Sequence, residues 1–411
     1  MNETVRRLLP LAIPSLLVGV LCSLILLLVS GLANLLQDFL WITVPAAFGI
    51  PGYSPGWILL TLTVAGLLVG LVVWKVPGHG GADPAKAELI EPPQSLGVLP
   101  SLALTAIIGL AGGVSLGPEN PIIAINVALA VWLGMRLMPR FGGEIYLILA
   151  AAGTIGALFG TPVAAALIFS ETVIGKVETP LWDRLFAPLV AAGAGALTTA
   201  VLAGEEFALD VAAYPGFHIG DWVSGSLIAS AAALIGLAAV YLFPLAYAGF
   251  RRMSHPVARL TFAGLLLGCL GMLGGHLTLF KGLHEMKELT ATAASYSGLA
   301  LLMMGLIKVA ALLVAGTSGF RGGRIFPAVF AGVALGLSVN SFFPSIPIAL
   351  ALTSAVLGIL LAVTRSGWLS LFTAMVVVPD LKLLPVLCVV VLPAWLLVTG
   401  RPHMIIKSDE K

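Results

Sequence analysis

The chain has 411 residues, of which 59% are hydrophobic and 10% charged, with a formal net charge of +2. Soluble domains carry about 25% charged residues, so this composition excludes a soluble protein and predicts one that crosses a membrane many times. The net charge indicates little about partners, but the sequence has no basic run, so we expect no nucleic acid as a partner. Three cysteines in apolar sequence and six histidines without ligand spacing indicate no disulfide framework, no metal site and no cofactor.

Charge-free stretches define the expected spans, and ten of them reach 18 residues or more. One span needs roughly 20 apolar residues and the longest stretches have room for two, so we expect about 10–14 spans, some tilted or partial. The first, within Met1–Leu36, is too long for a signal peptide, and Arg6 and Arg7 predict a cytoplasmic N-terminus. We expect residues 1–411 to form a single transmembrane domain, with approximate halves 1–215 and 216–411 and no cytoplasmic regulatory domain.

Two segments interrupt the apolar sequence in a way that a lipid-facing helix does not tolerate. They are SLGPENP (Ser115–Pro121) and SGFRGGRIFP (Ser318–Pro327), and each combines glycine, proline and a charged side chain. Irregular backbone occurs at membrane depth only where protein buries it or where it lines a cavity. A helix that starts there points unpaired N–H groups and its positive dipole end at whatever precedes it. The two segments therefore predict half-helix starts that bind a dehydrated anion.

The two halves of the chain repeat. A shift of 206 residues maps Gly117 onto Gly323 and Pro121 onto Pro327, and it also aligns the triplet VAL at 127–129 with its copy at 333–335. Small apolar residues recur by chance in any membrane protein, but matched glycines and prolines do so less often. Interrupted segments at corresponding places in two halves indicate the binding site of a transporter.

Glu119 is the central candidate in the first segment. It follows Gly117 and Pro118, and proline is favoured at the start of a helix. A carboxylate there accepts N–H groups as an anion would, and it leaves the site when it is protonated. The alternative is a simple helix cap on a loop outside the membrane, but 27 uncharged residues precede Glu119 and 16 follow it. We therefore interpret Glu119 as a gate, or as one half of a proton-for-anion exchange.

These segments resemble the pore motifs of the CLC family of chloride channels and proton-coupled anion transporters. The first matches the pattern G-[KR]-E-G-P at Gly117, Glu119 and Pro121, with Pro118 and Asn120 as departures. The resemblance covers roughly residues 10–400 and is greatest to a divergent bacterial branch of ion-transport proteins. It implies that Glu119 is the gating glutamate.

The second segment keeps the family frame S-G-x-x-G-G-x-F-x-P, with Ile325 at the usual phenylalanine and Phe326 one place later. A third motif is loosely present in Gly78–Pro84, where His79 takes the place of a serine that faces the inner anion site. The anion-binding residues that the resemblance implies are Gly117, Asn120, Ile122, Ile123, Gly323, Arg324, Ile325, Phe326 and His79. A late pore tyrosine is replaced by Asp380, so two familiar hydroxyl ligands are absent, which favours a deviation from plain chloride handling.

The family's proton path is also altered. The stretch from Phe159 to Thr172 resembles the corresponding family motif, and Glu171 fits its first acidic position, which makes Glu171 a candidate for a proton path. The next position holds an internal proton-handling glutamate in typical exchangers, and here it is Thr172. Channel and exchanger both remain open.

Other charged and reactive residues have competing interpretations. For Arg324 the alternatives are that it attracts anions, pairs with Glu119 or reaches an interfacial phosphate. For Lys308 they are that it neutralises a buried carboxylate or extends to the membrane surface. Gly316–Gly319 matches the G-x-S-G of intramembrane serine hydrolases, but the sole downstream histidine is His403, after the last span. We therefore expect no enzyme.

The resemblance implies an all-α polytopic fold of two inverted-topology repeats, with short, tilted and re-entrant helices, assembled as a homodimer. The small residues of Ala191–Ala196 allow close helix packing, between subunits or within one. The expected function is transport of a small monovalent anion across the bacterial inner membrane. Chloride or another halide is expected first, fluoride or nitrate next, with protons as the coupled ion in an exchanger. The runner-up hypotheses are a proton-coupled fluoride exporter of the same fold, and a transporter of another family built on inverted repeats.

Overall fold

The computed structural model describes residues 3–171, 180–204 and 207–406. Helices make up the described residues, with loops between them and one isolated β-bridge. The α-helices are α1 (Glu3–Asp38), α2 (Val44–Ala47), α3 (Pro55–Lys75), α4 (Leu99–Ala111), α5 (Glu119–Leu137), α6 (Gly143–Phe159), α7 (Pro162–Glu171), α8 (Leu181–Ala203), α9 (Ile219–Arg251), α10 (Pro256–Gly274), α11 (Leu283–Ala291), α12 (Gly298–Ser318), α13 (Ile325–Phe342), α14 (Ile348–Thr364), α15 (Gly367–Val377) and α16 (Leu383–Val398). Short 3₁₀ or π turns are η1 (Phe39–Thr43), η2 (Leu96–Val98), η3 (Pro139–Phe141), η4 (His276–Thr278) and η5 (Ala293–Ser295).

Within the described part, eight helical segments are long and apolar enough to cross a membrane, and six apolar helices are shorter. Prolines start several helices, as Pro55, Pro162 and Pro256 do, because proline has no N–H to leave unpaired at that position. Left-handed glycines end others: Gly160 after α6 and Gly319 after α12, with φ of 69° and 105°. The prediction of short and interrupted helices is confirmed.

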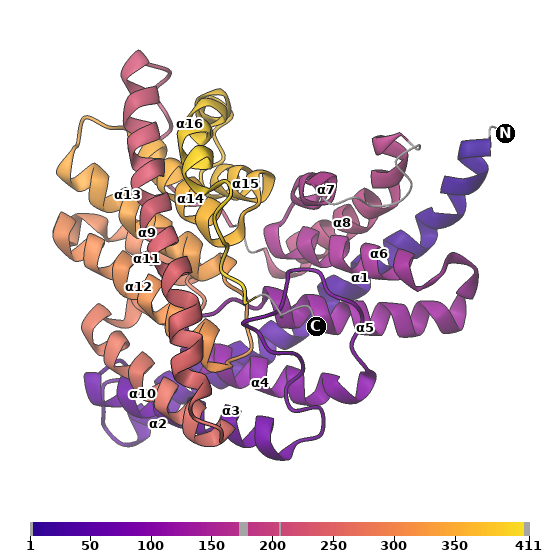
Figure 1. Ribbon diagram of the computed structural model, residues 1–411, viewed down its shortest axis with the longest axis horizontal. Coiled ribbons are helices and arrows are strands. Elements are labelled where there is room, and N and C mark those ends of the chain that lie inside the picture. Colours follow the sequence, from indigo (N-terminus) through magenta and orange to yellow (C-terminus); the bar gives the residue numbers. More distant parts are fainter. Residues whose placement is uncertain (1–2, 172–179, 205–206, 407–411) are drawn as a thin grey trace.

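The repeat extends from the motifs to whole helices. α5, α6, α7 and α8 are followed 202 to 206 residues later by the starts of α13, α14, α15 and α16. Figure 1 shows the second-half helices, in orange and yellow, on one side of the molecule, and α5 to α8, in magenta, on the other. The all-α fold of two repeats is thereby confirmed.

Close helix crossings join the two halves and consolidate each of them. α3 of the first half packs against α10 of the second, where a Cβ on Gly66 would lie 2.2 Å from the carbonyl oxygen of Leu260. The Ala191–Ala196 run packs within the chain, because a Cβ on Gly195 would lie 2.3 Å from the carbonyl oxygen of Gly153 in α6. Small residues therefore serve backbone contact inside the chain at this place.

Two long loops lie at opposite ends of α9 and define the two faces of the protein. At the start of α9 lies the loop 207–218, and the turn 275–282 lies on the same face, since Phe207 and Lys281 line one cavity. At its other end Arg251 donates to the carboxylate of Asp83, in the loop between α3 and α4. We call these the Lys281 face and the Asp83 face.

A candidate anion-binding site at two helix starts

The two predicted half-helix starts meet in the interior. Gly117 and Gly323 form an antiparallel bridge, in which the N–H of each donates to the carbonyl of the other, at 2.9 and 2.7 Å. These two glycines are the pair that the 206-residue shift relates. α5 and α13 begin two residues after them, so both helix starts point into the same small volume.

The Glu119 side chain occupies that volume and is fully buried. Its Oε1 accepts the N–H of Ile325 at 2.7 Å and, more weakly, that of Phe326 at 3.4 Å. Glu119 and Ile325 are themselves equivalent in the repeat, so the carboxylate of one half binds the first free amide of the other. A carboxylate oxygen held by amides at a helix start occupies the position of a bound anion.

Both glycines are needed to leave room for this carboxylate. A Cβ on Gly117 would lie 1.9 Å from Oε2 of Glu119, and a Cβ on Gly323 would lie 2.0 Å from its Cδ. Oε2 of Glu119 and the Ser115 hydroxyl are buried without a hydrogen-bond partner in the described residues. Buried polar atoms without partners are rare, and they mark places where a proton, water or ion completes the set.

Glu119 separates two cavities. Pro118 and Phe326 line one of about 200 Å³, the Phe326 cavity, together with Phe159, Phe207 and Lys281 on the Lys281 face. The rings of Phe159, Phe207 and Phe326 pack together there, with centroids 5.3 to 6.2 Å apart.

The second cavity, of about 320 Å³, lies towards the Asp83 face, and we call it the Arg324 cavity. Asn120, Arg324 and Ile325 line it, along with Glu171 and His403. At both helix starts, adjacent residues therefore line different cavities, with Pro118 and Asn120 on either side of Glu119. The carboxylate therefore lies between the two cavities.

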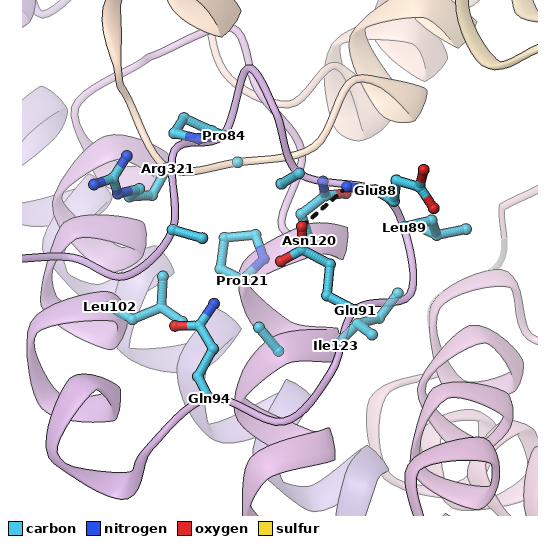
Figure 2. Close-up of a pocket in the computed structure, with 14 residues that line it drawn as sticks. Pro84, Glu88, Leu89, Glu91, Gln94, Leu102, Asn120, Pro121, Ile123 and Arg321 are labelled. Carbon is cyan, nitrogen blue, oxygen red and sulfur yellow. Dashed lines mark hydrogen bonds between the residues drawn. The ribbon is translucent and has the colours of Figure 1, made fainter. Parts of the chain in front are cut away.

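A third, smaller cavity of about 40 Å³ adjoins the start of α5. Figure 2 shows Asn120 and Pro121 at its centre, with Glu91 and Gln94 below them and Arg321 to the upper left. Oε1 of Glu91 accepts the N–H of Glu88 at 3.2 Å. Partial burial raises the pKa of the Glu91 carboxyl above its ordinary value.

The two arginines of the second motif hold the loop on the Asp83 face. Arg321 donates to the carbonyls of Gly80, His79 and Gly81, at 2.7, 3.1 and 3.2 Å. The Arg324 Nη2 donates to the carbonyls of Pro84 and Ala87, at 2.7 and 2.9 Å. The Arg324 hydrogen bonds thus go to backbone carbonyls, and not to Glu119 or to a phosphate. The side chain also lines the Arg324 cavity.

The structure brings most of the expected residues together and leaves others apart. Gly117, Glu119, Asn120, Gly323, Arg324, Ile325 and Phe326 surround the site. Ile122 follows in the first turn of α5, where its N–H already donates to the Pro118 carbonyl, and Ile123 lines the small cavity. The His79 ring is exposed and lies 2.8 Å from the Val73 carbonyl.

Glu171 lies on the wall of the Arg324 cavity, where it caps the start of α15. It accepts from the Ser366 hydroxyl at 2.5 Å and from the Trp368 N–H at 2.8 Å. Thr172, the expected substitute for the proton-handling glutamate, lies outside the described residues. Asp380 accepts from the N–H groups of Tyr214 and Lys382, so no hydroxyl from that position reaches the site.

Sequence reasoning missed Phe159, Phe207, Lys281 and the loop-holding role of Arg321. Phe159 begins the stretch from Phe159 to Thr172, which the sequence analysis singled out for Glu171 at its acidic end. Phe207 and Lys281 stand in connecting loops, and nothing in their local sequence distinguishes them from other loop residues.

Comparison with known proteins identifies the family. Residues 61–399 match the family model described as voltage gated chloride channel. This chain belongs to the CLC family. It is 51% identical over 411 residues to "Putative ion-transport protein YfeO" of Escherichia coli (strain K12 / DH10B), covering 100% of this chain and 98% of that protein. The protein of the same name from Shigella boydii serotype 4 is also 51% identical over the same coverage.

Solved CLC structures share the fold at low sequence identity. A CLC-type fluoride/proton antiporter superimposes with a TM-score of 0.75 at 20% identity, over 97% of each chain. A slow cyanobacterial Cl⁻/H⁺ antiporter gives 0.76 at 16% identity, over 98% of this chain and 96% of the other. These likenesses establish the arrangement of helices, and the family establishes ion transport as the general activity.

Proposed function

We propose that this CLC protein moves a small monovalent anion, chloride or another halide, through a pathway that Glu119 gates. The observation that carries the proposal is the hydrogen bond from the Ile325 N–H to Oε1 of Glu119, at 2.7 Å. A carboxylate in that position competes with an anion for the same helix-start amides. Gly117, Asn120, Gly323, Arg324 and Phe326 are the proposed walls of the binding site.

Protonation of Glu119 provides the release step. A neutral carboxyl accepts amide hydrogen bonds more weakly than a carboxylate does, so its hold on the start of α13 weakens when it gains a proton. The side chain then leaves and an anion takes its place between the two cavities. Glu171, on the wall of the Arg324 cavity, is the proposed second group on the proton path.

Proton-coupled fluoride export is the second candidate. The positions where the family provides hydroxyl ligands hold His79 and Asp380, and both side chains make contacts away from the site. A site without these hydroxyls departs from the usual chloride site. A structural neighbour of the chain is a fluoride/proton antiporter, although at 20% identity that likeness supports the fold alone.

We further propose that the chain acts as one transmembrane domain, 1–411, in a homodimer in the bacterial inner membrane. Arg6 and Arg7 ahead of the first span support a cytoplasmic N-terminus. The family match excludes the runner-up hypothesis of a transporter from another family built on inverted repeats. Family membership gives no support to the serine hydrolase reading, and the Ser318 hydroxyl donates to the Ala315 carbonyl at 3.3 Å.

The test is anion efflux from proteoliposomes loaded in turn with chloride, fluoride and nitrate, with the external pH followed at the same time. Efflux with stoichiometric proton movement would identify an exchanger, and fast efflux without proton movement would identify a channel. The anion that leaves fastest identifies the substrate. No efflux of any of the three would contradict the proposal.

Glu119→Gln tests the gate within the same assay. Glutamine keeps the shape and one acceptor oxygen but does not titrate, so the expected result is a loss of all proton dependence. Glu144→Gln, at an exposed glutamate in the first turn of α6, is the matched control and should behave as the native protein does. An unchanged pH response in Glu119→Gln would remove Glu119 from the mechanism.

A further inference from the structure

Of the described residues that line the Phe326 cavity, Lys281 is the one with a charged side chain. The other polar groups on its walls include the neutral side chains of Ser30 and Asn34 of α1 and of Thr199 of α8. Lys281 is partly buried, and no acidic group among the described residues forms an ion pair with it. Within the part of the chain that the structure describes, its charge is therefore unpaired at the wall of the cavity.

The backbone around Lys281 is held firmly in place. Phe280 and Gly282, on either side of it, have φ of 56° and 103°, so the chain makes a tight turn here. The Phe280 N–H donates to the Gly113 carbonyl at 3.1 Å, which ties the turn to the segment just before the first pore motif. The turn is thus fixed relative to the start of α5.

A buried lysine supports the same turn from beneath. The Lys308 Nζ, in the middle of α12, is 0% exposed and donates to the carbonyls of Thr278, Leu279 and Phe280, at 2.8 to 3.0 Å. A buried ammonium group is costly unless its protons are used, and here three consecutive carbonyls use them. Lys308 therefore neither extends to the membrane surface nor stands free, but fixes the turn that carries Lys281.

A buried acidic side chain lies next to the turn. Glu285, in the first turn of α11, is buried, and it forms no ion pair with Lys308 among the described residues. His284 and Glu285 line a smaller cavity beside Pro118, which Lys281 also lines. Lys281 is thus a positively charged side chain at the wall of both cavities beside Pro118.

We propose that Lys281 is a docking group that holds the anion in the Phe326 cavity before it reaches the helix starts. The inference rests on the proposed anion transport. Pro118 and Phe326, which flank the Glu119 carboxylate, line the same cavity as Lys281. An anion held there lies next to the amides that Glu119 releases, and a fixed positive charge raises the local anion concentration.

The test compares Lys281→Met and Lys281→Arg in proteoliposomes, with initial rates measured over a range of chloride and of fluoride concentrations. We expect Lys281→Met to raise the half-saturating concentration of the transported anion about tenfold and to leave the maximal rate nearly unchanged, since one charge near a pore mouth acts mainly on local concentration. Lys281→Arg should stay close to the native protein. Lys382→Met, at an exposed lysine before α16, is the control for charge and should show no shift.

The outcomes separate the two proposals. If the native protein transports an anion and Lys281→Met has an unchanged half-saturating concentration, the docking role of Lys281 is wrong and the proposed function stands. A fall in maximal rate alone would also overturn it, because that indicates a structural defect. If the native protein transports none of the anions, the proposed function itself fails.

Discussion

At the start of α5 the chain carries a carboxylate, and at the equivalent start of α13, 206 residues later, it offers backbone amides and two preceding arginines. The backbones are alike, since Gly117 and Gly323 pair with each other. The side chains differ, since Glu119 has Ile325 as its counterpart. Two carboxylates at this distance would repel each other, and two helix starts without a carboxylate would leave the amides at 325 and 326 without this acceptor. Because of this difference, one half supplies the carboxylate and the other half the amides that bind it.

Gly323→Ala breaks this arrangement and should have the largest effect. The new Cβ would lie 2.0 Å from Cδ of Glu119, so the carboxylate must move away from its position at the start of α13. Overpacking of this kind costs about 1–3 kcal/mol, which lowers the occupancy of that position by the carboxylate roughly 5- to 150-fold. Anion efflux measured against pH should then lose most of its proton dependence.

The control for Gly323→Ala is Gly193→Ala in α8, where nothing lies within 4 Å of the added Cβ. That variant should transport as the native protein does. If Gly323→Ala folds and keeps the native pH response, the carboxylate does not need this position, and the geometry of the gate is misassigned.

Arg321→Gln tests what the second half contributes and should have an intermediate effect. It removes the guanidinium hydrogen bonds to the carbonyls of His79, Gly80 and Gly81. Hydrogen bonds to charged groups contribute about 1.5–3 kcal/mol each, but Arg321 is half-buried and water replaces part of the loss, so we expect about 1.5 kcal/mol in all. The midpoint of thermal unfolding in detergent should fall by a few degrees.

Arg252→Gln, at an exposed arginine after α9, is the comparison and should leave the midpoint unchanged. Equal midpoints for Arg321→Gln and the native protein would mean that the loop on the Asp83 face is held by other contacts.

The sequence was sufficient to locate the centre of the candidate site because glycine, proline and charge are conspicuous within apolar stretches. Gly117, Glu119 and Gly323 were found in this way, and the 206-residue shift correctly indicated which residues meet. The family resemblance was confirmed by the match over residues 61–399. The interrupted segments are local features of the sequence and the repeat has a fixed interval, so both can be detected from the sequence alone.

Contacts between distant, unrelated segments were beyond such reasoning. Arg321 reaches back about 240 residues to Gly80, and Lys308 reaches back 28 residues to Phe280, with nothing in either local sequence to indicate the partner. Arg324 was expected to face an anion, Glu119 or a phosphate, yet its hydrogen bonds go to backbone carbonyls. A charged residue in apolar sequence signals that it has a partner, and only the fold identifies it.

Glu91→Gln probes the acidic surroundings of the first half and should have the smallest effect. Because burial raises the pKa of Glu91, the folded chain holds this proton more tightly than the unfolded chain does. The native protein therefore loses some stability as pH rises from the ordinary value of 4.5 through the raised pKa. Glutamine cannot ionise, so the thermal midpoint of Glu91→Gln should fall less over that range. Glu144→Gln, at an exposed carboxyl, should follow the native curve, and a Glu91→Gln curve that also follows it would mean that Glu91 gains no proton affinity on folding.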